Sequence, residues 1–329
     1  MPRILVTPVE LALGPSAAVD VLKNAGLEVV FPTPGSSMRD PAQLIQHLQG
    51  IDGVLASVEP YTPAVLAASK LRGIARAGVG YDSVDIEAAT AHGVVVTITP
   101  GTNHDSVAEQ ALALLFGVFR DVPYRDNQVR TGKWVRKSLW RLTGRTIGLI
   151  GLGRIGKAIV PRLQGLGLTV IAYDPYADPA FVKQANIRLT SLDELLAASD
   201  IVSLHCPVTK ETANLINAAT LAKMKRGSVL INTARGGLVD EEALVTALKS
   251  GHLAGAGLDA FQVEPLPLSS PLLTLNNVVL SPHSAGLDED SLRAMTCNAA
   301  QCLIDLAAGR MPQPEGSVVN TKLFPGWKW

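Results

Sequence analysis

Short apolar runs alternate with segments of helical length over residues 1–100. The expected strands are RILVT, EVVF, GVLAS, GIARAG and VVVTI, and the expected helices between them are SAAVDVLKNAGL, AQLIQHLQG, PAVLAAS and DIEAATAHG. Regular alternation of strand and helix is typical of βα units that form a parallel sheet. The pattern therefore predicts one parallel α/β sheet that ends near Pro100.

A second series of the same kind begins at Thr146. Its six expected strands are TIGLI, TVIAY, IVSLH, SVLIN, GAGLD and NVVLS, the last ending at Ser281. Residues 106–120, between the two series, are apolar at helical spacing and almost uncharged, which predicts a buried helix that crosses between domains. A last helix is expected over residues 291–309 and should return to the first domain.

The second series opens on a glycine pattern with a complete structural context. TIGLI is followed by Gly151, Gly153 and Gly156, then by a helical segment and a strand that ends at Asp174. In a dinucleotide fingerprint the glycines allow a tight turn, backbone approach to a pyrophosphate, and close helix–strand packing. The helix amides favour the phosphates. Asp174 lies 18 residues after Gly156, near the spacing of the acid that binds the adenosine ribose, so NAD is favoured over NADP.

These patterns predict an α/β protein of two doubly wound parallel-sheet domains. A Rossmann cofactor domain, residues 102–286, would be inserted into a flavodoxin-like substrate domain formed by residues 1–101 and 287–329. A length of 329 residues is consistent with about two domains. An apolar fraction of 47% with 18% charged residues is enough for buried parallel strands.

Charge and composition narrow the possible partners and the compartment. Formal net charge is zero, so we expect neither a nucleic-acid partner nor a membrane-surface partner. No apolar stretch is long enough to cross a bilayer, and MPRILVTPVE does not resemble a signal peptide. Cys206, Cys297 and Cys302 lack metal-ligand spacing. Reduced thiols in a cytoplasmic enzyme without a bound metal are therefore expected.

Three polar residues follow expected strands and are candidates for chemistry: Arg235, Glu264 and His283. An arginine can bind a carboxylate through two hydrogen bonds and polarise a carbonyl. A histidine can transfer the proton that accompanies hydride transfer, and a carboxylate on its other nitrogen would fix the tautomer. Taken singly, each also fits a structural role: a surface arginine, a loop glutamate before Pro265, or an interior histidine.

The motifs around these residues resemble the D-isomer-specific 2-hydroxyacid dehydrogenase family over nearly the whole chain. The matching stretches are RAGVGYDSVD, HDSVAEQALALLFG, TGKW, IGLIGLGRIG, LHCPVTKETANLIN, LINTARGGLVDEEAL, GAGLDAFQVEPLP and LSPHSAG. The resemblance implies that Arg235 binds the substrate carboxylate and carbonyl, that His283 is the acid/base, and that Glu264 is its partner.

The resemblance also implies the residues that bind cofactor and substrate. Arg154 and Ile155 would lie on the pyrophosphate and Asp174 on the ribose. Val79 and Gly80 would grip the substrate carboxylate through their amides, which agrees with a glycine-rich loop able to form an anion nest. The residues expected at NAD are Ser106, Gly151, Gly153, Arg154, Ile155, Gly156, Asp174, Cys206, Pro207 (adenosine side), Thr212, and Thr233, Ala234 and Asp259 (nicotinamide side). Those expected at the substrate are Ser57, Val79, Gly80 and Arg235.

Some positions depart from the relatives. Where phosphoglycerate-type members offer an arginine to the substrate phosphate, this chain has Ala56, and Glu59 nearby would repel a phosphate. Since the sequence stops at Trp329, the appended regulatory domain of many serine-pathway relatives is not expected. Formate-type relatives have an amide where Glu264 faces the histidine, so formate is not the expected substrate. An unphosphorylated 2-oxo or 2-hydroxy acid is favoured.

The expected function is an NAD-dependent D-2-hydroxyacid dehydrogenase, or 2-oxo acid reductase. A phosphoglycerate or phosphonate-type dehydrogenase and a dinucleotide-sensing corepressor are the alternatives. The expected partners are a small 2-oxo or 2-hydroxy acid and a second copy of the chain, in a homodimer for which Trp134 and Trp140 offer aromatic anchors. The exact substrate, the direction in the cell, the strictness for NAD and the role of the terminal FPGWKW stay open.

Overall fold

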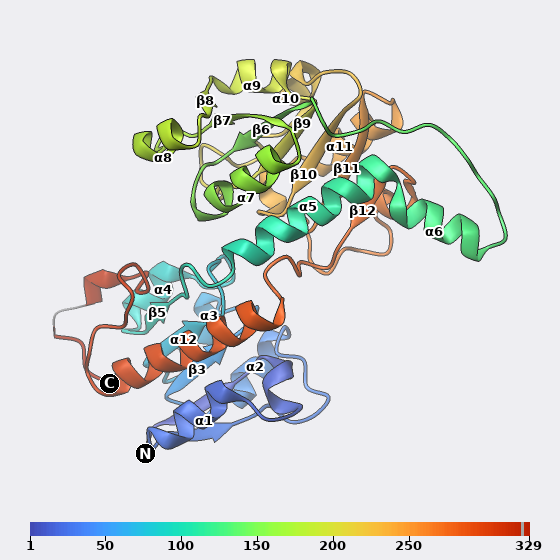
Figure 1. Cartoon of the computed structure of the whole chain (residues 1–329). Helices are drawn as coiled ribbons and strands as arrows, with labels where there is room; N and C mark the ends of the chain where they lie inside the picture. Colours follow the sequence, from blue (N-terminus) through green and yellow to red (C-terminus); the bar gives the residue numbers. More distant parts are fainter. Residues whose placement is uncertain (324–325) are drawn as a thin grey trace. The chain divides into compact units, whose positions relative to one another are not determined.

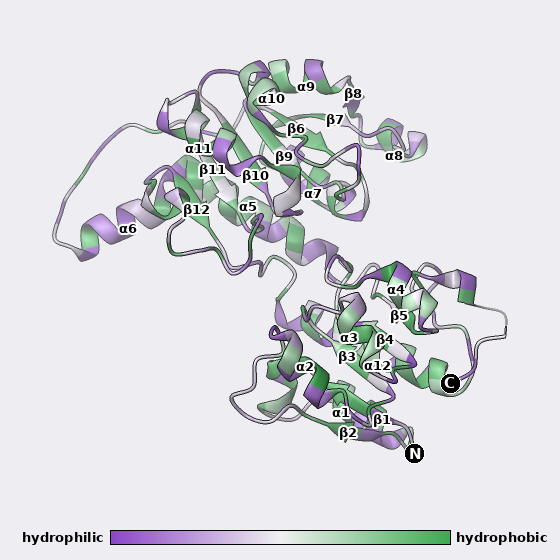
Figure 2. Ribbon diagram, turned by 180° about the vertical axis from the view of Figure 1, so that it is seen from behind, coloured by the Kyte–Doolittle hydropathy of each residue, from purple (hydrophilic) through white to green (hydrophobic). Residues whose placement is uncertain are grey.

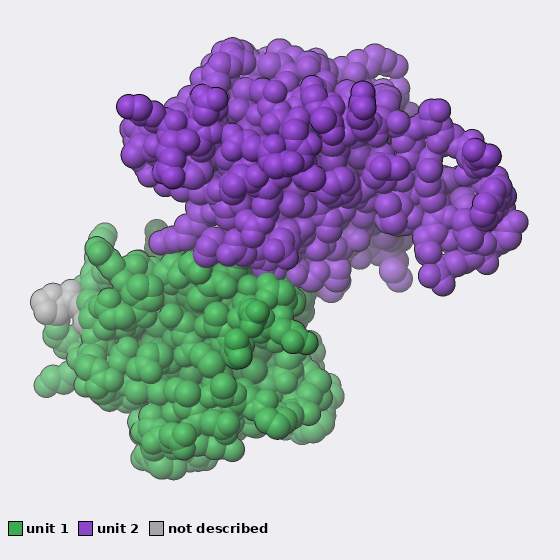
Figure 3. All heavy atoms as spheres, viewed as in Figure 1, with its two compact units in different colours: residues 1–103, 287–329 green, residues 104–286 purple. Residues whose placement is uncertain are grey.

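The computed structural model describes residues 1–323 and 326–329. It divides into two compact units, shown in different colours in Figure 3. Unit 1 comprises residues 1–103 and 287–329, and unit 2 comprises residues 104–286. From the sequence, the borders between domains are expected at residues 101/102 and 286/287.

Unit 1 is built on a five-stranded parallel sheet in the order β2-β1-β3-β4-β5. This is the flavodoxin-like order, which confirms the fold expected for this part of the chain. The strands are β1 (Arg3–Val6), β2 (Glu28–Val30), β3 (Gly53–Ala56), β4 (Gly73–Arg76) and β5 (Val95–Thr97). The helices are α1 (Ala17–Asn24), α2 (Pro41–His47), α3 (Pro63–Ala67), α4 (Ile86–Ala91) and α12 (Glu289–Ala307).

Helices cover both faces of this sheet because alternate strand residues point to opposite sides. Ile4 and Leu55 pack with α1 and α12 on one face. Val54 and Ile74 pack with α2, α3 and α4 on the other. The helix expected over residues 291–309 is α12, and it returns to this unit as predicted (Figure 1).

Two tryptophans of the terminal FPGWKW pack on unit 1. Trp327 donates its indole N–H to the carbonyl of Gly93 at 2.8 Å. Trp329 fills a notch over β3 and β4, since a β-carbon on Gly53 would lie 2.8 Å from its ring and one on Gly73 would lie 3.2 Å from it. Phe324 and Pro325 of the same segment lie outside the described residues.

Unit 2 contains a parallel sheet in the order β12-β11-β10-β9-β6-β7-β8. The strands are β6 (Thr146–Ile150), β7 (Thr169–Tyr173), β8 (Arg188–Leu189), β9 (Ile201–Leu204), β10 (Ser228–Asn232), β11 (Leu253–Leu258) and β12 (Val278–Leu280). The six expected strands are present. The sequence pattern does not predict β8, because two exposed edge residues carry no apolar alternation.

The helices of unit 2 are α5 (His104–Arg120), α6 (Val122–Arg130), α7 (Arg154–Gly165), α8 (Pro179–Gln184), α9 (Leu192–Ala198), α10 (Ala218–Lys223) and α11 (Glu241–Lys249). Those with residues in the two cores of this unit form a layer on each face of the sheet, whereas α6 extends beyond α5 (Figure 1). One core joins α5 and α7 to the sheet, and the other joins α9, α10 and α11 to the opposite face. Figure 2 shows the apolar strands between these layers. The predicted helix over residues 106–120 lies within α5.

The strand order reverses between β6 and β9. The chain proceeds outward from β6 to β8, then returns to place β9 beside β6 and continues to β12. In doubly wound sheets, ligands bind outside the carboxyl ends of the strands at this reversal. In unit 2 those ends carry the fingerprint glycines after β6 and His205 after β9.

Candidate cofactor and active site

The three fingerprint glycines occupy three different environments. Gly151 has φ 100°, and a β-carbon there would lie 2.7 Å from the backbone of His205. A β-carbon on Gly156 would lie 2.5 Å from the carbonyl oxygen of Gly151. Gly153 caps α7 and faces open space. The first and third glycines therefore hold the turn closed, while the second leaves room for a phosphate at the amides of Arg154 and Ile155.

Asp174 follows β7 and lies against the glycine loop. Its Oδ2 accepts the N–H of Leu152 at 2.6 Å, and its Oδ1 accepts the N–H of Tyr176 at 2.8 Å. Each carboxylate oxygen retains a second acceptor position for a ribose hydroxyl. The acid predicted to read the ribose thus also fixes the loop predicted to hold the pyrophosphate.

The loop after β9 carries three residues expected at the cofactor. Thr212 donates its hydroxyl to the carbonyl of Pro207 at 2.7 Å and accepts the N–H of Thr209 at 2.7 Å. Its hydroxyl is therefore engaged in closing its own loop. Burial, together with the nearby charge of Asp174, raises the pKa of Cys206 to about 11, so its thiol stays protonated at neutral pH.

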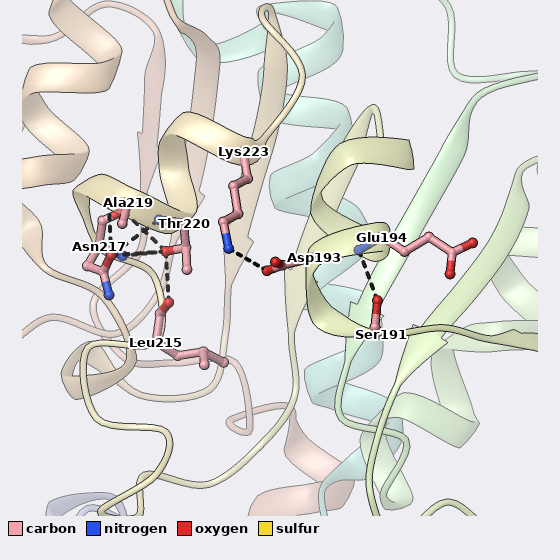
Figure 4. A network of polar contacts seen from close by, with 8 residues as sticks. All are labelled: Ser191, Asp193, Glu194, Leu215, Asn217, Ala219, Thr220 and Lys223. Carbon is pink, nitrogen blue, oxygen red and sulfur yellow. Dashed lines mark hydrogen bonds and ion pairs between the residues drawn. The ribbon is translucent and has the colours of Figure 1, made fainter.

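A polar network secures the far end of this loop (Figure 4). Asn217 caps α10 and exchanges hydrogen bonds with Thr220, whose hydroxyl donates to the carbonyl of Leu215 at 2.8 Å. Lys223, at the end of α10, pairs with Asp193 of α9 at 2.7 Å. The end of the loop at α10 is therefore held by the helix cap and by the Lys223–Asp193 pair.

Glu264 and His283 form a hydrogen-bonded pair. The Nδ1 of His283 lies 2.7 Å from Oε2 of Glu264, and Oε1 of Glu264 accepts the N–H of Phe261 at 2.9 Å. Burial favours the neutral form of Glu264. The hydrogen bonds from His283 and Phe261, with the positive charges of His283 and Arg235, outweigh it and lower the pKa of Glu264. Because Nδ1 is engaged, Nε2 is the ring nitrogen that can exchange a proton with a ligand.

Arg235 reaches the same edge of the sheet through an unusually close backbone contact. It follows β10, and a β-carbon on the next residue, Gly236, would lie 1.9 Å from the carbonyl carbon of Phe261. Only a residue without a side chain lets this turn pack on the segment that leads to Glu264. β10, β11 and β12 are neighbours, so Arg235, Glu264 and His283 all follow adjacent strands.

The structure places the residues expected beside the nicotinamide at this edge. Thr233 is 6% exposed, and its buried Oγ1 has no hydrogen-bond partner among the described residues, which suits a bound polar group. Ala234 follows it in the turn between β10 and Arg235. Asp259 and Ser106 both bond to the segment that carries His283, a relationship that sequence reasoning missed.

The substrate residues expected in unit 1 follow β3 and β4. The Ser57 N–H donates to Oε2 of Glu59 at 2.8 Å and to Oγ1 of Thr7 at 3.1 Å. Val79 is 37% exposed, beside Gly80. Glu59, expected to repel a phosphate, turns inward and is 3% exposed. Its burial raises its pKa, against hydrogen bonds from Thr7 and Ser57. The carboxylate accepts the backbone N–H of Ser57, and its repulsion of a phosphate stays a prediction.

Comparison with known proteins identifies the family. Residues 112–285 match the family model described as the D-isomer specific 2-hydroxyacid dehydrogenase, NAD binding domain. A glyoxylate reductase of Korarchaeum cryptofilum is 40% identical over 279 residues, covering 82% of this chain and 83% of that protein. The chain belongs to the D-isomer specific 2-hydroxyacid dehydrogenase family. Its NAD-binding domain contains the fingerprint, Asp174 and the Glu264–His283 pair.

Two further proteins match this chain over different shares of their length. A D-3-phosphoglycerate dehydrogenase of Mycobacterium tuberculosis is 46% identical over 265 residues, which cover 79% of this chain and 50% of that protein. The chain thus spans about half the length of the mycobacterial phosphoglycerate dehydrogenases it matches. The crystal structure of a protein from Thermus thermophilus aligns with a TM-score of 0.86 at 38% identity, covering 96% of this chain and 99% of that one.

No helix among the described residues is long and apolar enough to cross a membrane. Within the same residues, no group of three or more His, Cys, Asp or Glu side chains is arranged to hold a metal ion.

Proposed function

We propose that this protein is an NAD-dependent D-2-hydroxyacid dehydrogenase that acts on small, unphosphorylated 2-oxo and 2-hydroxy acids. The observation that supports the proposal most directly is the 2.7 Å hydrogen bond between His283 and Glu264, at the strand ends next to Arg235. An oriented histidine can protonate the carbonyl oxygen of a 2-oxo acid while a neighbouring arginine binds the carboxylate of that acid.

Each residue has a defined task in this proposal. The guanidinium of Arg235 binds the substrate carboxylate and polarises the adjacent carbonyl. The Nε2 of His283 donates a proton to the carbonyl oxygen during reduction and accepts it during oxidation, while Glu264 stabilises the charged ring. Bound NAD supplies the hydride acceptor or donor for C2 of the substrate. Ser57, Val79 and Gly80 stay predicted substrate-binding residues of unit 1.

A phosphoglycerate-type activity is the second candidate. It is favoured by the 46% identity to phosphoglycerate dehydrogenases. Against it stands Ala56, which offers no cation to a phosphate at the position where an arginine is expected in those relatives. The discriminating measurement is oxidation of NADH with glyoxylate, hydroxypyruvate, pyruvate and 3-phosphohydroxypyruvate. A kcat/KM for the phosphorylated acid equal to that for the small acids would contradict our choice.

The same panel tests the alternative of a dinucleotide-sensing corepressor. Absence of turnover with every 2-oxo acid, combined with tight NADH binding, would favour that role. Repeating the panel with NADPH measures how strictly the protein uses NAD, and assays in both directions measure the preferred direction.

We also propose a cytoplasmic homodimer formed through residues 121–141 of unit 2. This segment contains α6 and an extended stretch in which Trp134 is 80% exposed and Val135 is 47% exposed. Trp140 contacts Phe119 edge-on and is 47% exposed, so it is partly packed within its own unit. Light scattering of W134A tests the assignment. A variant that keeps the molar mass of the native protein would contradict it.

A further inference from the structure

A buried carboxylate makes three hydrogen bonds to the segment that carries His283. Asp259 is 0% exposed. Its Oδ1 accepts the hydroxyl of Ser281 at 2.5 Å and the N–H of Ser284 at 3.0 Å, and its Oδ2 accepts the N–H of Ala285 at 2.9 Å. Three donors on both sides of His283 thus meet one side chain.

The sheet explains how one residue reaches so many partners. Asp259 follows directly after β11, and Ser281 follows directly after β12. The last paired residues of these strands are Leu258 and Leu280, so Asp259 and Ser281 leave the sheet side by side. The N–H of Ser281 still donates to the carbonyl of Leu258 at 2.9 Å. The pairing of β11 with β12 therefore fixes the position of Asp259 beside Ser281.

The backbone at His283 needs such support. His283 has φ 52°, in the left-handed region that residues with side chains seldom occupy. Residues in this region persist when surrounding contacts determine them, and they concentrate at functional sites. A fourth contact lies on the far side, where Ser106 of α5 donates its hydroxyl to the carbonyl of Ala285 at 2.7 Å.

We infer that Asp259 is a positioning residue for His283. Its carboxylate holds residues 281–285 in the one conformation that turns the imidazole toward Glu264. This inference rests on the proposed function, since it gives His283 the role of acid/base. It differs from the expected place of Asp259 near the nicotinamide, because each of the three side-chain hydrogen bonds of Asp259 goes to the histidine segment.

Two substitutions separate this role from general damage. Asp259→Asn keeps the size and one acceptor oxygen but sets an NH2 group against a backbone N–H. We expect kcat/KM to fall about 100-fold. Ser281→Ala removes one of the three donors, and we expect a loss of about 10-fold that Ser281→Thr restores. Ser270→Ala, which removes a serine that caps a short helical turn in the same unit, is the control and should leave kcat/KM unchanged.

The deciding readout is a double-mutant cycle with His283→Ala. If Asp259 acts through His283, then Asp259→Asn and Ser281→Ala lower the residual activity of His283→Ala by less than about twofold. Full multiplicative losses in that background would overturn the inference, since Asp259 would then act directly on cofactor or substrate.

Hydrogen exchange provides a readout that does not need turnover. We expect the amides of Ser284 and Ala285 to exchange at least about 10-fold faster in Asp259→Asn, and at the native rate in Ser270→Ala. Unchanged exchange in Asp259→Asn overturns the inference. If the native protein turns over no 2-oxo acid, the proposed function fails, while the exchange rates still decide whether Asp259 holds the segment.

Discussion

The carboxylate of Glu264 lies between two donors, the N–H of Phe261 at 2.9 Å and the Nδ1 of His283 at 2.7 Å. The first contact fixes the position of the carboxylate, and the second transmits that position to the imidazole. The histidine ring is therefore oriented by a side chain that the backbone itself orients. This pair and other contacts within unit 2 predict how four substitutions change activity, cofactor preference or stability.

Replacing Glu264 by Gln should lower kcat/KM about 100-fold at neutral pH, because the amide cannot stabilise a charged imidazole. The pKa of Glu264 is lower in the folded protein than in the unfolded chain. The Glu264–His283 pair therefore contributes its full stabilisation above the unfolded pKa of Glu264, and this stabilisation is lost as pH falls through the folded pKa. The measurement is the pH profile of kcat/KM for both proteins. Glu242→Gln, an exposed change on α11, is the matched control, and a native-like profile for Glu264→Gln would refute the role.

Replacing Asp174 by Ala should relax the preference for NAD over NADP, since the carboxylate no longer accepts from the ribose or opposes a 2′-phosphate. Stability should also fall by about 1–2 kcal/mol, because the N–H groups of Leu152 and Tyr176 lose their acceptor. Dissociation constants for NADH and NADPH test the first effect and thermal unfolding tests the second. Asp193→Asn, at the exposed pair with Lys223, controls for loss of surface charge. Unchanged discrimination would count against the ribose assignment.

Gly236→Ala should be far more damaging than Gly237→Ala. A β-carbon at Gly236 would lie 1.9 Å from the backbone of Phe261, whereas one at Gly237 would lie 3.5 Å from Val208, an ordinary contact. The first variant must separate the Arg235 turn from the segment before Glu264. We expect it to lose at least about 2 kcal/mol of stability and most of its activity. Urea unfolding and kcat/KM of both variants provide the comparison, and equal behaviour of the pair would show that the close contact is not required.

His205 should make the protein sensitive to mild acid. Burial lowers its pKa to about 4, and its buried Nδ1 has no partner among the described residues. Between pH 6.5 and about 4, His205 is protonated in the unfolded chain but stays neutral in the folded protein. The free energy of unfolding therefore falls as pH falls through this range, by at most about 3 kcal/mol. His205→Gln should flatten the pH dependence of unfolding in this range, and exposed His92→Gln should not. A parallel pH dependence in native protein and His205→Gln would exclude this histidine as the cause.

Much of the architecture could be predicted because strands buried on both faces form continuous apolar runs. The dinucleotide fingerprint could also be predicted. The turn packs so closely against neighbouring backbone that only glycine fits at residues 151 and 156, and this requirement appears in the sequence as a glycine pattern. The short edge strand β8 was not predictable, because its residues are exposed and pack little.

The side-chain partners were harder to foresee. Glu59 follows a strand end like the catalytic candidates do, yet it folds back onto the amide of Ser57 two residues earlier. The hydrogen-bond partners of Asp259 lie in the segment that follows β12, more than twenty residues later in the sequence. No local spacing around Asp259 predicts them. Which atoms a polar side chain meets depends on strand order, and strand order is a property of the assembled sheet.

The position of Trp329 has a consequence for the sequence of β3 and β4. The ring rests where Gly53 and Gly73 leave space, so Trp329 belongs to the packing of these two strands. A larger residue at either glycine would meet that ring, at 2.8 Å from a β-carbon on Gly53 and 3.2 Å from one on Gly73. These three positions, far apart in the sequence, therefore constrain one another.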